Sequence, residues 1–325
     1  MNDQERYNRL MEQLQIELGS EIMAACLDEA VTGIKVGGDG KLIVKKHSIA
    51  WENTGIVLDA NRRVRLLGII SSELGKTFNG ESALLSGELP RTGSRLQGWG
   101  NPLADTAFVI RRHSSQIFTL DDYVTAGILE PWQADLLRQH ILNLSTIVVC
   151  GATDSGKTTF LNALIAEMVG TQHLIILEDT TELRCEAENV LRLKSDPPRV
   201  TLRDLVTSTL RADGDRLIIG EVRGPEGWDM IQALNMGRRG GLTTVHADNA
   251  RGALLRFGMM CQQAGLTPQW LQIQEAIDVI VHIKMQANGK RRVTELQEVQ
   301  HENVSERIPI ELKPLGPALV NGVTH

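Results

Sequence analysis

Two kinds of hydrophobic periodicity divide the chain, and the first third contains both helical and strand-like segments. Leu10, Leu14 and Leu18 recur every four residues, which predicts an amphipathic helix that ends near Gly19. A second helical pattern covers residues 60–74. We expect these two segments to be the helices of this region.

Strand patterns accompany these helices. Residues 31–36 and 41–46 are short strand-like segments, and the Gly-Gly-Asp-Gly turn between them supplies the positive φ values that a hairpin requires. A third segment of this kind covers residues 107–112, after a stretch that is punctuated by glycine and proline. The pattern predicts a small α+β domain over residues 1–112.

Strands alternate with helices in the rest of the chain. A helix is expected to begin at Thr119, because a threonine followed by acidic residues caps the positive end of a helix dipole. Beyond it lie continuous apolar runs, which are typical of a parallel sheet covered on both faces. These runs are residues 145–150, 173–179, 215–222 and 241–247. The predicted fold class is α/β, with a linker at 113–120 and an α/β domain at 121–325.

Composition and charge argue against several classes of protein. With 34 basic and 40 acidic residues the net charge is −6, whereas proteins that coat nucleic acid usually carry a basic surplus. No apolar run reaches the ~18 residues of a membrane-spanning helix, and the first residues lack a signal-peptide pattern. The four cysteines include no Cys-x-x-Cys pair, which argues against a zinc site. We expect a soluble protein of a reducing compartment.

A glycine-rich loop carries the strongest functional signal. Residues 151–158, Gly-Ala-Thr-Asp-Ser-Gly-Lys-Thr, fit the pattern G-x-x-x-x-G-K-[ST] between an apolar strand and a helix. Main-chain N–H groups of such a loop surround phosphate oxygens at the positive end of the helix dipole. Lys157 is expected to contact the β- and γ-phosphates, and the Thr158 hydroxyl to bind Mg²⁺. A glycine-rich turn without a ligand is the alternative. The predicted nucleotide contacts in the loop are Gly151, Ala152, Thr153, Asp154, Ser155, Gly156, Lys157, Thr158 and Thr159.

Three later strands end in polar side chains that are expected to gather beside this loop. Glu221 follows an apolar strand and is the predicted general base, while Glu178 and Asp179 end the strand before it. His246 follows a third strand, although a histidine there is by itself more often an ordinary loop residue. Because open α/β sheets bind ligands at the carboxyl ends of their strands, we expect one shared site.

These segments, in this order, resemble the hexameric type II/IV secretion ATPases. The marks of that family are a phosphate loop, an acidic box, a strand that ends in Gly-Glu and a histidine box. The corresponding segments here are GATDSGKTT, ILEDTTEL, LIIGEVRGPE and GGLTTVHADNA. The flanking segments LPRTGSRLQG, AFVIRR and FTLDDYVTAGIL are similar to the conjugal-transfer branch of the type IV secretion ATPases.

The resemblance implies a RecA-like P-loop ATPase domain, a smaller PAS-like domain before it, and a homohexameric ring that uses ATP and Mg²⁺. Arg95 and Arg111 match arginines of the amino-terminal domain that reach the phosphates, and Arg112 is an alternative to Arg111. Glu178 and Asp179 match the acidic box. The implied catalytic residues are Glu221, Lys157, His246, Arg95 and Arg111, and the implied metal contacts are Thr158 and Glu178.

The resemblance also implies partners and a location. The ring would dock on inner-membrane components of a type IV secretion or conjugation apparatus, at the cytoplasmic face of that membrane. A basic run formed by Arg62, Arg63 and Arg65 would suit a peripheral contact with anionic lipid. Such a run is more often a solvated helix face or a subunit contact. No sequence-specific nucleic-acid binding is expected.

The chain departs from the family pattern at three points, and the first bears on activity. Asp154 stands where the family usually has glycine, which places an acidic side chain in a loop that wraps a polyanion. Residues 211–215 and the Arg238-Arg239 pair also replace familiar residues. ATP hydrolysis that drives assembly or substrate transfer is the leading hypothesis. The alternatives are a nucleotide-binding assembly subunit with little or no turnover, and a DNA-translocating helicase.

Overall fold

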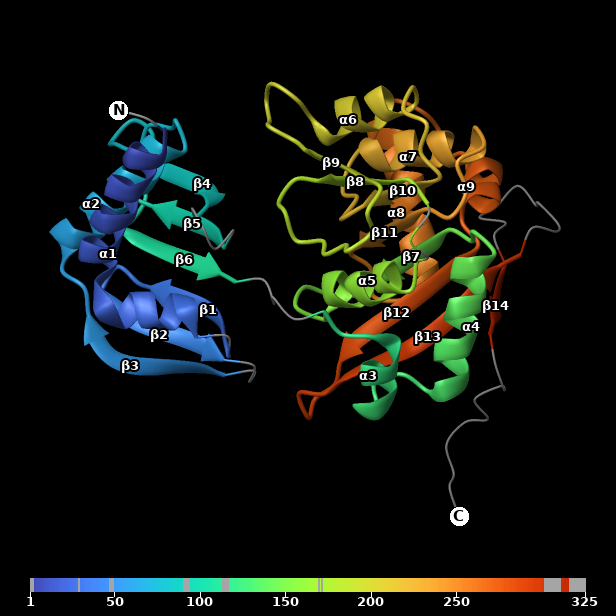
Figure 1. Ribbon diagram of the computed structural model, residues 1–325, viewed down its shortest axis with the longest axis horizontal. Coiled ribbons are helices and arrows are strands. Elements are labelled where there is room, and N and C mark those ends of the chain that lie inside the picture. The colour runs from blue at the N-terminus through green and yellow to red at the C-terminus, as the bar shows by residue number, and fades with distance from the viewer. Residues whose placement is uncertain are drawn as a thin grey trace, which may run out of the picture. The chain divides into compact units, whose positions relative to one another are not determined.

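The computed structural model describes residues 3–28, 30–46, 50–89, 94–112, 117–168, 170, 172–300 and 311–315. The chain divides into two compact units, Met1–Ser115 and Gln116–His325, and each unit is described by itself (Figure 1). Residues 113–116 of the predicted linker lie outside the described residues. None of the described helices is long and apolar enough to cross a bilayer.

An antiparallel sheet of six described strands, in the order β3-β2-β1-β6-β5-β4, is the framework of the first unit. Two helices contact each other, and α2 buries Leu66, Leu67 and Ile70 in a core that it shares with the sheet. Leu67 approaches β5 so closely that a Cβ atom at Gly98 would lie 2.9 Å from it. The elements are α1 (Asp3–Leu27), α2 (Ala60–Glu73), β1 (Val31–Val36), β2 (Lys41–Lys46), β3 (Trp51–Val57), β4 (Leu84–Glu88), β5 (Arg95–Trp99) and β6 (Ala107–Arg111).

The predicted hairpin β1–β2, the helix α2 and the strand β6 are confirmed, and the first helix breaks at Gly19 as expected, although the chain continues as a helix beyond it. Gly19 has a φ of 71° and a ψ of 167°, so the chain leaves the helix for one residue and resumes it as far as Leu27. Both Leu18 and Ile22, on either side of this kink, are buried in the core. Glycine permits the break because it lacks the Cβ atom that disfavours positive φ.

The arginines of the basic run on α2 bind other parts of their own unit. The Arg62 guanidinium donates to the carbonyls of Glu17 (2.6 Å) and Ile16 (3.3 Å), just before the kink in α1. Arg63 is buried and donates to two carbonyls of the β1–β2 turn at 2.6 Å each, and Arg65 pairs with the Glu17 carboxylate at 2.8 Å. These contacts favour an intramolecular role for the run over a contact with lipid headgroups.

A mixed sheet of eight described strands, in the order β14-β13-β12-β7-β11-β10-β8-β9, is the framework of the second unit. The strands from β12 to β9 run parallel, and the β12-β13-β14 edge is antiparallel. The apolar runs correctly predicted the parallel strands β7, β8, β10 and β11, but not β9 or the antiparallel edge. The strands are β7 (Ile147–Cys150), β8 (Leu174–Glu178), β9 (Val190–Lys194), β10 (Arg216–Ile219), β11 (Leu242–Val245), β12 (Val279–Met285), β13 (Arg291–Val299) and β14 (Leu312–Pro314).

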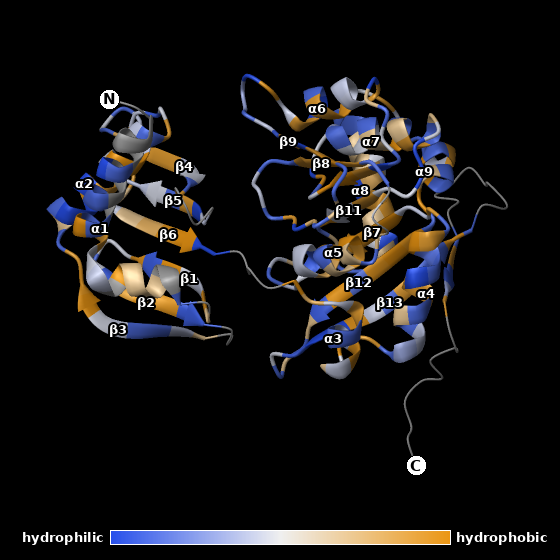
Figure 2. Cartoon of the chain, in the orientation of Figure 1, coloured by the Kyte–Doolittle hydropathy of each residue, from blue (hydrophilic) through white to orange (hydrophobic). Residues whose placement is uncertain are grey.

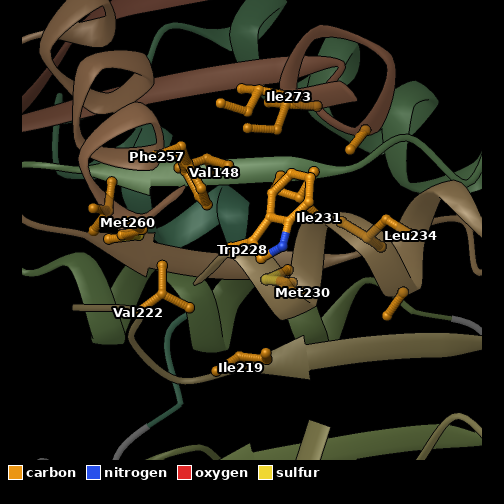
Figure 3. Packing of buried hydrophobic residues seen from close by; sticks show 14 of the residues in the cluster. Val148, Ile219, Val222, Trp228, Met230, Ile231, Leu234, Phe257, Met260 and Ile273 are labelled. Carbon is orange, nitrogen blue, oxygen red and sulfur yellow. The ribbon is translucent and has the colours of Figure 1, made fainter. Parts of the chain in front are cut away.

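Helices cover both faces of this sheet, and alternate strand residues enter two separate cores. Val148 and Ile219 face a core with Trp228 of α7 and Phe257 of α8 (Figure 3), whereas Val149 faces the opposite core beneath α5. Figure 2 shows the resulting hydrophobic colour along β7 and β12. Because both faces are buried, these strands have no polar alternation. The helices are α3 (Leu120–Thr125), α4 (Pro131–Leu142), α5 (Lys157–Ala166), α6 (Leu202–Thr209), α7 (Glu226–Asn235), α8 (Ala250–Gln263) and α9 (Trp270–Ala276).

Candidate functional site

The glycine-rich loop joins the end of β7 to the start of α5, at the carboxyl edge of the parallel strands. A Cβ atom at Gly151 would lie 2.3 Å from the carbonyl oxygen of Ile283, so only glycine fits there. Gly156 caps the helix with a φ of 98°, a left-handed conformation that favours glycine. Asp154 has a φ of 63°, in the left-handed region that glycine adopts more readily than aspartate. The loop therefore has the tight, helix-capping backbone that its sequence predicts.

Lys157 begins α5 and directs its side chain back into the loop. It is 7% exposed, and its Nζ donates to the carbonyl of Ala152 at 2.9 Å and lies 3.2 Å from Nδ1 of His246. Thr158 and Thr159, in the same helical turn, are half-buried. The hydroxyl of Ser155 is buried without a hydrogen-bond partner among the described residues. The loop thus holds one cation and an unsatisfied hydroxyl.

The carboxylate of Glu221 lies beside this cation, separated from it by one imidazole ring. Glu221 follows β10 after Gly220, and its Oε1 is 2.8 Å from Nε2 of His246. That oxygen is buried and, among the described residues, accepts no hydrogen bond of regular geometry. Sheet order explains the meeting, because β7, β11 and β10 are adjacent parallel strands whose ends meet at one edge. The structure brings Lys157, His246 and Glu221 together.

The surroundings of His246 favour its neutral form. Burial and the nearby Lys157 ammonium lower the pKa of His246 below its usual 6.5, and the Glu221 carboxylate only partly opposes this shift. A neutral imidazole accepts from the lysine through Nδ1 and presents Nε2–H toward the carboxylate. His246 therefore links the cation to the acid without adding a positive charge beside it.

Glu178, the last residue of β8, and Asp179, which follows it, form the predicted acidic box at the same edge, and both accept hydrogen bonds from neighbouring segments. The Oε1 of Glu178 accepts from the backbone N–H groups of Glu182 and Leu183, both at 2.7 Å. Burial raises the pKa of Glu178, and these two hydrogen bonds oppose the rise. Asp179 accepts from the Ser195 hydroxyl at 2.6 Å. A metal contact by Glu178 stays a prediction.

The two predicted arginines of the first unit are cross-strand neighbours. Arg95 on β5 and Arg111 on β6 stand directly opposite each other in the antiparallel register, and both are exposed. Glu88 on β4 is the register partner of Arg95 on its other side. The register therefore places two arginines and one glutamate side by side across β4, β5 and β6. Their part in a nucleotide site stays a prediction.

Two arginines near the loop, Arg291 and Arg223, were not among the predicted site residues. Arg291, on β13, donates to the carbonyl of Asp154 at 3.4 Å, and its Cδ would lie 2.9 Å from a Cβ atom at Gly156. Arg223 forms an ion pair with Oε2 of Glu221. The sequence carries no signal for Arg291, because it lies 137 residues beyond Asp154 and enters through the unpredicted β12–β13 hairpin.

Two of the departures from the family pattern contact each other. The guanidinium of Arg238 donates to the carbonyls of Thr209 and Ala212, at the end of α6. A Cβ atom at Gly214 would lie 2.3 Å from Ile175 and 3.3 Å from Arg238, so the turn at 211–215 has no room for a side chain there. Arg238 and this glycine-containing turn therefore form one local arrangement, in which the arginine binds carbonyls at the end of a helix.

The residues present fit a polyphosphate tail with a bound magnesium ion. The loop backbone is closed to side chains at Gly151, which leaves main-chain N–H groups to approach a ligand. Lys157 supplies the charge, and the buried Ser155 hydroxyl and the Glu221 Oε1 are polar atoms without a hydrogen-bond partner among the described residues. The Thr158 hydroxyl is the oxygen that such loops offer to Mg²⁺. The site can therefore bind a nucleotide and place a carboxylate beside its phosphates.

Comparisons with known proteins place the chain in a family. Residues 100–308 match the family described as type II/IV secretion system protein. The chain is 37% identical over 287 residues to the conjugal transfer protein TrbB of Rhizobium radiobacter, covering 87% of this chain and 88% of that protein. It is 35% identical over 296 residues to a probable TrbB of Sinorhizobium fredii, covering 90% of each.

A solved structure shows the same fold at lower identity. The X-ray structure of the Legionella pneumophila ATPase DotB superposes with a TM-score of 0.60 and 16% identity, covering 93% of this chain and 81% of that one. The family match spans more than half of the chain, and the TrbB alignments extend over both units. The chain is a member of the type II/IV secretion ATPase family.

Proposed function

We propose that this protein is an ATPase that powers type IV secretion or conjugative transfer, by coupling ATP hydrolysis to assembly or to substrate movement. One observation carries the proposal: Lys157 of the phosphate loop, His246 and Glu221 form a continuous chain of contacts at 3.2 Å and 2.8 Å. The likeness to the conjugal transfer proteins TrbB supports the setting. The chemistry is ATP + H₂O to ADP + phosphate.

In this proposal each residue has one task at the phosphates. The loop N–H groups and Lys157 would hold the β- and γ-phosphates, and Thr158 and Glu178 would hold Mg²⁺. The ion, when bound, neutralises charge that develops on the phosphate oxygens. Glu221 orients the attacking water and takes its proton. His246 stays neutral and fixes the Glu221 carboxylate between the loop and β10.

The proposal extends to the assembly. The first unit is a PAS-like domain and the second a RecA-like one, and six copies form a ring that closes around ATP. Arg95 and Arg111 approach the γ-phosphate in this assembly. An arginine at that position contributes about 10³ to 10⁵ in rate. The ring docks on inner-membrane components of the transfer apparatus from the cytoplasmic side. Arg62 and Arg63 bind backbone carbonyls of their own unit and Arg65 pairs with the Glu17 carboxylate, which favours protein contacts over lipid as the main anchor.

Phosphate release by the purified full-length protein tests this function. We expect turnover that needs Mg²⁺ and that falls at least 100-fold in Lys157→Ala, because the phosphates lose their main cationic contact. Lys284→Ala, an exposed lysine on β12, is the matched control and should leave turnover unchanged. Equal rates in wild type and Lys157→Ala would contradict the proposal.

A nucleotide-binding assembly subunit with little turnover is the second candidate, and Asp154 favours it. Its φ of 63° places an acidic residue at a glycine-like position in the loop. An inert wild type that gains turnover as Asp154→Gly would establish this alternative. Stimulation of turnover by single- or double-stranded DNA would instead indicate a translocating helicase, which the net charge of −6 disfavours.

A further inference from the structure

Arg223 engages the oxygen of the predicted base that His246 does not face. Its Nη2 pairs with Oε2 of Glu221, while Oε1 of the same carboxylate lies 2.8 Å from Nε2 of His246. Both carboxylate oxygens therefore have a nitrogen neighbour in this state. A carboxylate that must position a water and accept its proton needs an oxygen directed at that water.

Hydrogen bonds of its own N–H groups fix the backbone of the loop that carries Arg223. The Glu226 carboxylate accepts from the N–H groups of Arg223 and Gly224, both at 2.7 Å, at the start of α7. The N–H of Val222 donates to the carbonyl of Thr244 at 3.0 Å, and the Val222 side chain is buried. The backbone at residues 222–224 is thus anchored independently of the Arg223 side chain. Only the side chain has to move for the ion pair to break.

The Arg223 side chain is half exposed and lies among acidic neighbours. Its side chain is 51% exposed, and the negative charges that raise its pKa are Glu221 first and, more weakly, Asp179 and Glu182. Only the His246 ring separates Glu221 from Lys157, the cation that faces the β- and γ-phosphates in the proposed function. A γ-phosphate is a stronger partner for a guanidinium than one carboxylate, because it carries more negative charge and also accepts a bidentate pair.

We propose that Arg223 is a positioning residue that holds Glu221 in a resting ion pair and transfers to the γ-phosphate when ATP binds, which frees the base. ADP lacks the group that draws the arginine away, so the pair persists with ADP bound. This inference rests on the proposed function, since it takes Glu221 as the base. It makes Arg223 the residue through which the site distinguishes ATP from ADP.

The test compares the affinities of AMP-PNP and ADP, each with Mg²⁺, for full-length wild type and three variants by calorimetry. Arg223→Gln should weaken AMP-PNP roughly tenfold and leave ADP unchanged, because it loses a charge-assisted contact to the third phosphate. Glu221→Gln should tighten AMP-PNP severalfold, because it releases Arg223 from its partner. The double variant should lose that gain. Arg203→Gln, an equally exposed arginine paired with Asp229 at 2.6 Å, is the matched control and should match wild type.

The outcomes separate this inference from the proposed function. Equal changes in AMP-PNP and ADP affinity would mean that Arg223 acts only on the structure of the site, and would overturn the inference. An Arg223→Gln variant that binds both nucleotides as tightly as wild type would overturn it as well. In both cases a wild type that binds and cleaves ATP leaves the proposed function standing. A wild type that binds neither nucleotide overturns both.

Discussion

Asp154 is an acidic residue in a conformation that favours glycine, so Asp154→Gly changes the loop in two separable ways. The residue has a φ of 63°, and its carboxylate lies in the loop that is proposed to wrap the phosphates. Glycine removes both the left-handed strain and the charge. Asp154→Asn removes only the charge, because asparagine tolerates this region of φ and ψ as well as aspartate does.

The two effects have different expected sizes. Relief of left-handed strain is worth on the order of 1 kcal/mol, and the greater freedom of glycine in the unfolded chain costs about 0.5–1 kcal/mol, so stability changes little. A unit charge about 6 Å from a phosphate costs roughly 0.7 kcal/mol at the dielectric constant of water and roughly 3 kcal/mol at 20. Asp154 is exposed, so we expect a value near the lower end, about 1 kcal/mol, which is roughly a fivefold change in affinity.

Nucleotide titration and urea denaturation of the same samples measure these effects. We expect both variants to bind Mg-ADP roughly fivefold more tightly than wild type, with free energies of unfolding within about 1 kcal/mol of it. Tighter binding in Asp154→Gly alone would show that backbone strain, not charge, limits affinity. Weaker binding in both variants would show that the Asp154 carboxylate supports the loop, and would contradict the expectation that its charge weakens nucleotide binding.

Two further perturbations probe the loop and the sheet. Gly156→Ala should abolish nucleotide binding at nearly normal fold content, because the residue has a φ of 98° and its new Cβ would meet Arg291 at 2.9 Å; normal affinity by titration would contradict this. Burial lowers the pKa of His282 below its usual 6.5. Below pH 6.5 the histidine is therefore protonated more readily in the unfolded chain than in the folded one. Stability should therefore fall as the pH drops from 6.5 to 5.5, by up to about 1.4 kcal/mol per unit for this histidine, and His282→Gln should flatten the urea-denaturation profile. An unchanged profile in that variant would show that other groups dominate.

The parallel part of the sheet could be predicted because its physical cause is local in sequence. Strands buried on both faces must be continuously apolar, and β7, β8, β10 and β11 show this directly. Parallel strands present their carboxyl ends at one edge, so the meeting of Lys157, His246 and Glu221 follows from the order of the strands.

Other elements have causes that the local sequence does not contain. β3 is exposed along almost its whole length, so it shows no apolar alternation. The β12–β13 hairpin brings Arg291 to the loop through pairing of β12 with β7, which lies more than 130 residues earlier. Long-range pairing of this kind leaves no periodicity to detect.

The Glu221 carboxylate is proposed to act on a nucleotide held by the loop at 151–159. Single-turnover hydrolysis by Glu221→Gln is the sharpest test of this role. The glutamine keeps the size of the side chain and its contact with His246 but cannot accept a proton. We expect this variant to bind Mg-ATP at least as tightly as wild type and to cleave it about 10² to 10⁴ times more slowly. Cleavage at the wild-type rate by the well-folded variant would contradict it.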